Sequence, residues 1–189
     1  MIGTAAVHDH VARLRTALDA LESNAGLLDR WACHLGSVLP GGHRLLVAGN
    51  GGSAALAVHL TAELTGRYQH DRPAFSAIAL VADPASVTAI GNDYGFEQVF
   101  ARQVDAHARA GDVVLLLSTS GRSPNLLAAA RAATSRRATC WALTGAAPNP
   151  LSVMVDEALT VEGDTPTVQE VHQVAVHLLC ELFDREVVL

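Results

Sequence analysis

The stretch Val113-Val-Leu-Leu-Leu-Ser-Thr-Ser-Gly-Arg-Ser-Pro-Asn125 predicts the unit around which the rest of the chain is organised. Its apolar start indicates a buried strand, and Pro124 fits the first helical position, with Ser123 as the N-cap. Backbone N–H groups at a helix N-terminus attract anions, so the hydroxyl-rich loop between them is expected to bind a phosphate. An ordinary capped turn is the alternative. The four hydroxyls belong to Ser118, Thr119, Ser120 and Ser123.

The composition narrows the possible functions. Half of the 189 residues are apolar, which is enough for a substantial core, and the net charge of -6 argues against nucleic acid as the main ligand. No apolar run is long enough to span a bilayer, and the first residues lack the features of a secretion signal, so we expect a cytoplasmic protein. The three cysteines are widely spaced, as in a reducing compartment. All thirteen basic residues are arginines, which excludes a Schiff-base lysine and a Walker loop.

The chain alternates between short apolar runs and helical patterns. This alternation predicts a five-stranded parallel sheet with helices on both faces, a three-layer α/β/α fold that binds ligands at the carboxyl ends of its strands. We expect one domain over 1–189, with N-terminal helices in 1–40 and the core in 41–189. A polar turn is expected at 91–95, a helix at 96–109 and a short helix at 150–155. The expected strands are 44–48, 76–81, 113–117, 138–143 and 157–161. The last helix is expected at 165–187.

A glycine-rich loop, Gly49-Asn-Gly-Gly-Ser53, follows the first strand. With Ala54 it matches a relaxed dinucleotide-binding fingerprint, although a tight strand-to-helix turn explains it as well. The acidic residue that such a site needs is not at the expected spacing, because Asp83 lies about ten residues too far along the chain. Dinucleotide binding is therefore the weaker interpretation of this loop.

Two helices carry polar side chains suited to chemistry. His59 and Glu63 are four residues apart and share a helix face, so they could hold a metal or transfer protons together, or form an ordinary surface pair. Gln169, Gln173 and His177 lie on one side of the mostly apolar last helix. Polar groups there need partners or a cavity, and a buried, hydrogen-bonded histidine is the alternative to a functional one.

Five motifs occur in order along the chain. They are Gly-Asn-Gly-Gly-Ser, His-x-x-x-Glu, Gly-Asn-Asp, Ser-Thr-Ser-Gly-x-Ser and Gln-Glu-x-His-x-x-x-x-His. Together they resemble the sugar isomerase (SIS) family, and most closely the phosphoheptose isomerases, over about 14–185. The resemblance implies conversion of D-sedoheptulose 7-phosphate to D-glycero-D-manno-heptose 7-phosphate, the first step of nucleotide-activated heptose biosynthesis. It also implies a homotetramer whose active sites combine more than one subunit.

The same resemblance implies roles for individual residues. Glu63 and His177 would be the acid–base pair of the enediolate reaction. Zinc, one per subunit, would be bound by His59, Glu63, Gln169 and His177. The phosphate would be held by the four hydroxyls of the loop at 118–123. The other substrate-binding residues would be Asn50, Gly51, Gly52, Ser53, Glu63, Asn92, Asp93 and Gln169.

The chemistry agrees with these roles, because moving a proton between C1 and C2 needs a carboxylate, an imidazole and stabilisation of the enediolate. Three departures from the family pattern affect substrate orientation and subunit contacts: Leu56 in place of Asp, Pro166-Thr-Val before Gln169, and 146–150 in place of a Gly-Gly pair. A non-catalytic SIS protein that binds a sugar phosphate or a partner, like the replication initiator-associating protein, is one alternative, and a nucleotide-dependent oxidoreductase is a weaker one. The presence of both Glu63 and His177 favours the isomerase.

Overall fold

The computed structural model describes residues 2–187 of the chain. Five parallel strands form one sheet in the order β2-β1-β3-β4-β5. The strands are β1 (Leu45–Gly49), β2 (Ala77–Ala79), β3 (Val113–Ser118), β4 (Thr139–Gly145) and β5 (Glu157–Val161). The register aligns the carboxyl ends of the three central strands, since Gly49 pairs with Leu117 and Leu117 with Leu143. The loops that follow these strands therefore start at one edge of the sheet.

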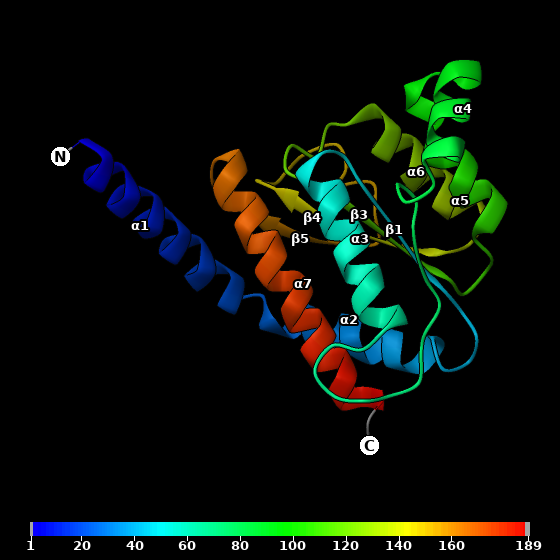
Figure 1. Ribbon diagram of the computed structural model, residues 1–189, viewed down its shortest axis with the longest axis horizontal. Helices are drawn as coiled ribbons and strands as arrows, with labels where there is room; N and C mark the ends of the chain where they lie inside the picture. Colours follow the sequence, from blue (N-terminus) through cyan, green and yellow to red (C-terminus); the bar gives the residue numbers. More distant parts are fainter. Residues whose placement is uncertain (1, 188–189) are drawn as a thin grey trace.

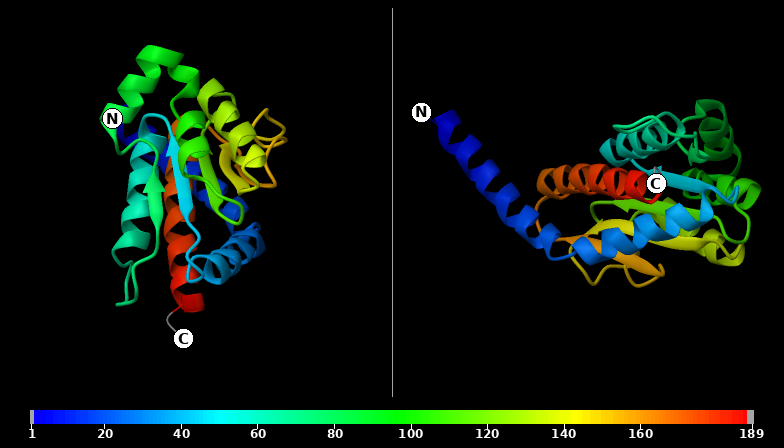
Figure 2. Two further views of the ribbon diagram at one scale, coloured as in Figure 1. Left: turned by 90° about the vertical axis from the view of Figure 1, so that its right-hand side faces the viewer. Right: turned by 90° about the horizontal axis from the view of Figure 1, so that it is seen from below.

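Helices cover both faces of the sheet, so the fold has three layers (Figures 1 and 2). They are α1 (Ile2–Glu22), α2 (Ala25–Val38), α3 (Gly52–Thr65), α4 (Pro84–Tyr94), α5 (Ala101–His107), α6 (Pro124–Ser135) and α7 (Thr165–Val187), with a 3-10 turn at Phe96–Gln98. One core joins α1, α2, α3 and α7 to the sheet, and the other lies under α5 and α6. The predicted three-layer α/β fold is confirmed.

Strand β3 shows why two separate cores form. All six of its residues are buried, and alternate side chains point to opposite faces of a strand. Leu115 and Leu117 accordingly join the core beneath α3 and α7, whereas Val114 and Leu116 join the core beneath α6. The apolar run of the sequence is thus divided between the two layers.

The N-terminal helices differ in how they pack. Helix α2 lies on the sheet, where Trp31 stacks on Trp141 of β4 with ring centroids 4.7 Å apart. Helix α1 contacts α7 but projects beyond the rest of the molecule (Figures 1 and 2), and Val7 is 62% exposed. None of the helices in residues 2–187 is both long and apolar enough to cross a membrane.

Three local expectations were wrong. The predicted polar turn at 91–95 is mostly the last turn of α4, which ends at Gly95 with a φ of +86°. The predicted helix at 96–109 is a 3-10 turn followed by the short α5. The stretch 150–155 forms turns instead of a helix, because its backbone is hydrogen-bonded to Asn149 and to the loop after β3. These segments are held by contacts that local sequence patterns do not encode.

Candidate active site

The hydroxyl loop joins β3 to α6. Gly121 adopts a φ of +60°, and its N–H donates to the Oγ of Ser118 at 3.1 Å. The Oγ atoms of Ser118 and Ser123 lie 3.5 Å apart, and the Arg122 N–H donates to the Oγ of Ser120 at 3.3 Å. Ser123 is at the N-cap position, as predicted, yet its hydroxyl makes no capping hydrogen bond within the described chain. That hydroxyl is therefore available to a ligand at the α6 N-terminus.

Asn149 packs against Gly121 of this loop, a contact that no local sequence pattern predicted. Its side-chain nitrogen donates to Thr144 Oγ1 at 3.1 Å and to the carbonyl oxygen of Ala146 at 3.0 Å. Asn149 is only 5% exposed, and a Cβ at Gly121 would overlap its amide. The glycine is required for this close approach as well as for its positive φ.

A pair of amides links the two loops that follow β1 and β3. Asn50 donates to Asn125 Oδ1 at 3.0 Å, and Asn125 donates back to Asn50 Oδ1 at 2.9 Å. Asn125 is 2% exposed and lies in the first turn of α6, directly after Pro124. Asn125 was not singled out by the sequence analysis. The one sequence signal for it was the position of an amide directly after Pro124, next to the proposed phosphate loop. The pair fixes the glycine-rich loop relative to the hydroxyl loop.

The remaining residues of the glycine-rich loop start α3. Gly51 has a φ of +57° and is the N-cap residue, followed by Gly52 as the first helical residue. Ser53 is buried, and its N–H donates to the Asn50 carbonyl at 3.0 Å. The loop therefore turns sharply and leaves two glycines exposed at the helix N-terminus.

Helices α3 and α7 lie side by side (Figure 1) and bring the predicted acid–base residues together. The Nε2 atoms of His59 and His177 are 2.8 Å apart, with their rings inclined at 68°. Glu63 Oε1 lies 3.6 Å from His59 Nδ1. The side chains of Glu63 and His59 are 21% and 37% exposed, so a small molecule can reach them. The site thus combines a carboxylate with two imidazoles.

Gln173 completes this group. Its side-chain nitrogen lies 3.0 Å from His177 Nε2 and can only donate. His177 Nε2 is then the acceptor of this hydrogen bond. The ring of Tyr68 lies 5.8 Å from the His177 ring. The four-residue spacing on the last helix was noted in the sequence, but it did not distinguish Gln173 from Gln169.

Gln169 lies nearer the α7 N-terminus, packed on Gly52. A Cβ at Gly52 would overlap the Gln169 amide, so a larger residue there would displace the Gln169 side chain. A pocket of about 360 Å³ opens here. It is lined in part by Leu56, which stands where the family pattern has Asp. The full lining is Gly52, Leu56, Pro166, Gln169, Glu170 and Gln173. Gln169 is therefore close to the glycine-rich loop, two helical turns from His177.

Asn92 and Asp93 are exposed on α4 and are hydrogen-bonded to each other, with 2.8 Å between Asn92 Nδ2 and Asp93 Oδ1. They follow β2, the edge strand, rather than one of the three central strands. The structure does not bring them against the histidine pair. Their predicted contact with the substrate stays a prediction.

Two buried groups beside the site are held neutral. Burial lowers the pKa of His172 to about 4, and its Nε2–H donates to the Thr144 carbonyl at 3.3 Å. Burial, with the nearby Glu63 charge as a smaller cause, raises the pKa of the Cys180 thiol to about 12. A buried, neutral thiol is a poor nucleophile, so Glu63 and the two imidazoles are left as the reactive groups.

The proposed metal ligands are only partly assembled. Across residues 2–187, the structure has no group of three or more His, Cys, Asp and Glu side chains arranged to hold a metal ion. The predicted ligand set is mixed, since it includes an amide from Gln169. The structure joins His59, Glu63 and His177 and keeps Gln169 apart from them.

Comparison with known proteins identifies the family of this chain. A sequence model described as the SIS domain matches residues 9–145, and the chain belongs to this family. A phosphoheptose isomerase of Streptomyces coelicolor is 61% identical over 176 residues, covering 93% of this chain and 76% of the relative. One from Bradyrhizobium sp. (strain ORS 278) is 45% identical, covering 94% and 92%. Within the SIS family, the chain belongs to the phosphoheptose isomerases.

A solved structure agrees with this placement. A phosphoheptose isomerase from Neisseria gonorrhoeae superposes with a TM-score of 0.86 at 36% identity, covering 96% of this chain and 98% of that one. A second, from Francisella tularensis, has a TM-score of 0.84 at 34% identity. The likeness therefore extends over the helices at both ends as well as the sheet.

Proposed function

We propose that this protein is an aldose–ketose isomerase that converts D-sedoheptulose 7-phosphate to D-glycero-D-manno-heptose 7-phosphate. This is the first step of nucleotide-activated heptose biosynthesis. The observation that carries the proposal is the meeting of Glu63 with His59 and His177 across two helices, in a chain 61% identical to a phosphoheptose isomerase. A regulator that only binds a sugar phosphate would not need a carboxylate and two imidazoles in this arrangement.

The hydroxyl loop is proposed to bind the substrate phosphate. Ser118, Thr119, Ser120 and Ser123 provide hydroxyl donors, and the N-terminus of α6 adds the positive end of the helix dipole. The amide pair of Asn50 and Asn125 holds the glycine-rich loop in register with this phosphate site. Asn50, Gly51, Gly52 and Ser53 would then contact the sugar.

Proton transfer is proposed to belong to Glu63. A carboxylate at the edge of the site takes a proton from one of C1 and C2 and returns it to the other, through an enediolate. His177, which lies beside His59 and Gln173, would exchange a proton with the sugar oxygens and assist ring opening. Gln169, beside the glycine-rich loop, would orient the sugar hydroxyls.

One zinc ion per subunit is proposed from the resemblance to the family, and part of the proposed ligand set, His59 and His177, already lies together. Two ring nitrogens on one tetrahedral zinc lie about 3.3 Å apart at the usual Zn–N distance, only slightly farther than the two Nε2 atoms here. A site of nitrogen and oxygen donors suits catalytic zinc. We propose His59, Glu63, Gln169 and His177 as its ligands, and the Gln169 side chain, which packs on Gly52, would have to move toward the other three. When bound, zinc would stabilise the negative charge that develops on the substrate oxygens.

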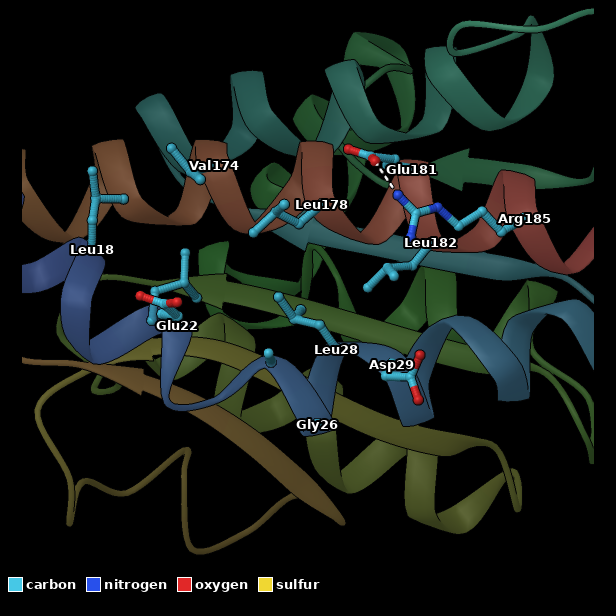
Figure 3. A pocket seen from close by; sticks show the side chains of 12 residues that line it. Leu18, Glu22, Gly26, Leu28, Asp29, Val174, Leu178, Glu181, Leu182 and Arg185 are labelled. Carbon is cyan, nitrogen blue, oxygen red and sulfur yellow. Dashed lines mark hydrogen bonds and ion pairs between the residues drawn. The ribbon is translucent and has the colours of Figure 1, made fainter.

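The chain is also proposed to form a homo-oligomer, with the tetramer as the family expectation. An apolar groove of about 630 Å³ lies between α1, α2 and α7 (Figure 3), where Leu18, Leu28, Val174, Leu178 and Leu182 face one another. Glu22, Asp29, Glu181 and Arg185 form its charged rim. A second copy would cover this groove and the exposed part of α1. The 1–40 helices would then belong to the same domain as the 41–189 core and serve assembly.

The test is direct. Purified protein, with and without added zinc, is incubated with sedoheptulose 7-phosphate, and the product is identified by NMR. Formation of the aldose 7-phosphate is expected from the wild type and not from Glu63→Gln. Binding of the sugar phosphate without conversion under both conditions would favour the regulator instead.

A further inference from the structure

Arg72 lies in the segment between α3 and β2, outside the candidate active site. Its side chain is 1% exposed, which is exceptional for a guanidinium. Its Nε donates to Asp184 Oδ1 at 2.7 Å, and the Asp184 side chain on α7 is 6% exposed. A fully buried ion pair therefore connects the end of one site-bearing helix to the other.

The rest of the guanidinium binds the α3 backbone. Its Nη2 donates to the carbonyl of Glu63 at 2.8 Å, and its Nη1 donates to the carbonyl of Leu64 at 3.0 Å. Carbonyls in the last turn of a helix lack partners within the helix, so Arg72 acts as a side-chain cap. One of the two capped carbonyls belongs to the proposed base itself.

Two aromatic rings fix the position of the guanidinium. Its central carbon lies 5.3 Å from the ring centroid of Phe75 and 5.4 Å from that of Phe183. The two rings pack edge to face, with centroids 5.2 Å apart. Nη1 also donates to the Pro73 carbonyl at 3.0 Å, and a cation held between rings and bonded to four acceptors has little freedom to move. Lysine could keep the charge but not this planar fork.

Fold stability gives little reason for such a pair. Burying two charges is costly, and replacing a buried ion pair by apolar side chains is often neutral or stabilising. Asp184 Oδ2 is buried without a hydrogen-bond partner among the described residues, so part of the desolvation is uncompensated. The arrangement suggests a geometric role instead.

We propose that Arg72 and Asp184 are positioning residues that set the distance and angle between α3 and α7, and thereby hold His59 and Glu63 of α3 beside His177 of α7. Asp184 lies two helical turns beyond His177 on α7, and Arg72 holds the backbone of Glu63 directly. This inference rests on the proposed isomerase function.

The decisive variant is the double substitution Arg72→Met with Asp184→Leu. It removes both charges together, so no buried ion is left unpaired, and it should fold with a Tm near that of the wild type. A misplaced base should lower kcat by about 10- to 100-fold, while KM stays nearly unchanged because the phosphate loop is untouched. If the double variant does not fold, Arg72→Lys takes its place. This single variant should also have a lower kcat than the wild type.

A second readout is independent of substrate and metal. The imidazole ¹⁵N shifts of His59 and His177, measured in metal-free protein, report whether their Nε2 atoms remain in contact. The shifts should change in the variants. The matched control removes the exposed pair Arg136–Asp105, by Arg136→Met with Asp105→Leu, and should leave kcat and the shifts unchanged. Phe100→Leu, in the opposite core, should lower Tm without lowering kcat in the folded protein.

Wild-type kcat, or wild-type imidazole shifts, in a folded Arg72 variant would overturn the proposal. Its failure is distinguishable from failure of the proposed function. If the wild type does not convert sedoheptulose 7-phosphate at all, the isomerase proposal fails, and the imidazole shifts alone decide whether Arg72 positions the two helices.

Discussion

At the scale of single residues, Glu63 has the most demanding role. Glu63→Gln keeps the shape of the side chain but removes the base, so we expect the fold and substrate binding to be retained and turnover to be lost. Exchange of substrate hydrogen with deuterated solvent should be lost too, since both need the same proton transfer. Mass spectrometry of substrate recovered from deuterium oxide measures this. Rapid exchange in the variant would assign the base to another group.

His177 should behave differently from Glu63. Because it is proposed to act on sugar oxygens, His177→Asn should retain slow exchange at carbon while net conversion is lost. NMR can follow both quantities in one sample. Loss of exchange equal to that of Glu63→Gln would contradict this division of roles.

His172 makes fold stability depend on pH. Its pKa is lowered from 6.5 to about 4 by burial, so the unfolded chain binds its proton at a higher pH than the folded chain does. The stabilisation is complete above about pH 6.5, falls as the pH drops and reaches its minimum below about pH 4, with a loss of about 2 kcal/mol between pH 7 and 5. Urea unfolding at both pH values should show a smaller difference in His172→Gln. The exposed His70, changed to Gln, is the control and should leave the difference unaltered.

At the scale of elements, the loop between β3 and α6 is predicted to bind phosphate. Ser120→Ala should raise KM, because a hydrogen bond to a charged phosphate contributes about 1.5–3 kcal/mol. The fold should be unaffected, since Ser120 is exposed and its Oγ accepts one local hydrogen bond. Steady-state kinetics checks this. Unchanged KM in Ser118→Ala, Ser120→Ala and Ser123→Ala would reduce the loop to a helix cap.

The sequence predicted the elements whose signals are local. Apolar runs of five or six residues indicated the central strands, and the hydroxyls before Pro124 marked the start of α6 correctly. The elements that depend on distant partners were missed or misassigned. The stretch around Asn149 is shaped by the loop at Gly121, 28 positions earlier, and no spacing rule connects the two.

In the candidate site, too, the sequence predicted local relations between residues but not those that depend on distant partners. The four-residue spacing on α3 correctly put His59 beside Glu63, because helical periodicity is local. Which glutamine of α7 approaches His177 depends on how α7 rotates against α3, and that rotation is set by packing. Asn125 and Arg72 escaped notice because their partners, Asn50 and Asp184, are 75 and 112 positions away.

At the scale of the whole molecule, we predict that the chain assembles into a homo-oligomer. Light scattering should give a mass several times the 19.8 kDa of one chain, near fourfold for a tetramer. Leu178→Glu puts a charge into the apolar groove beside α1 and α2 and should lower the measured mass. Val153→Glu, at a position 72% exposed and outside the groove, is the control. A wild-type mass of one chain at micromolar concentration would reject the oligomer.

The stacked pair Trp31 and Trp141 contains both tryptophans of the chain. Intrinsic fluorescence excited at the indole band therefore reports on a single place, the contact of α2 with β4. Emission should change when the N-terminal helices leave the sheet, and an opening confined to α5 and α6 on the other face would go unseen. A fluorophore attached on that second layer would be needed to learn whether the two halves of the molecule unfold together.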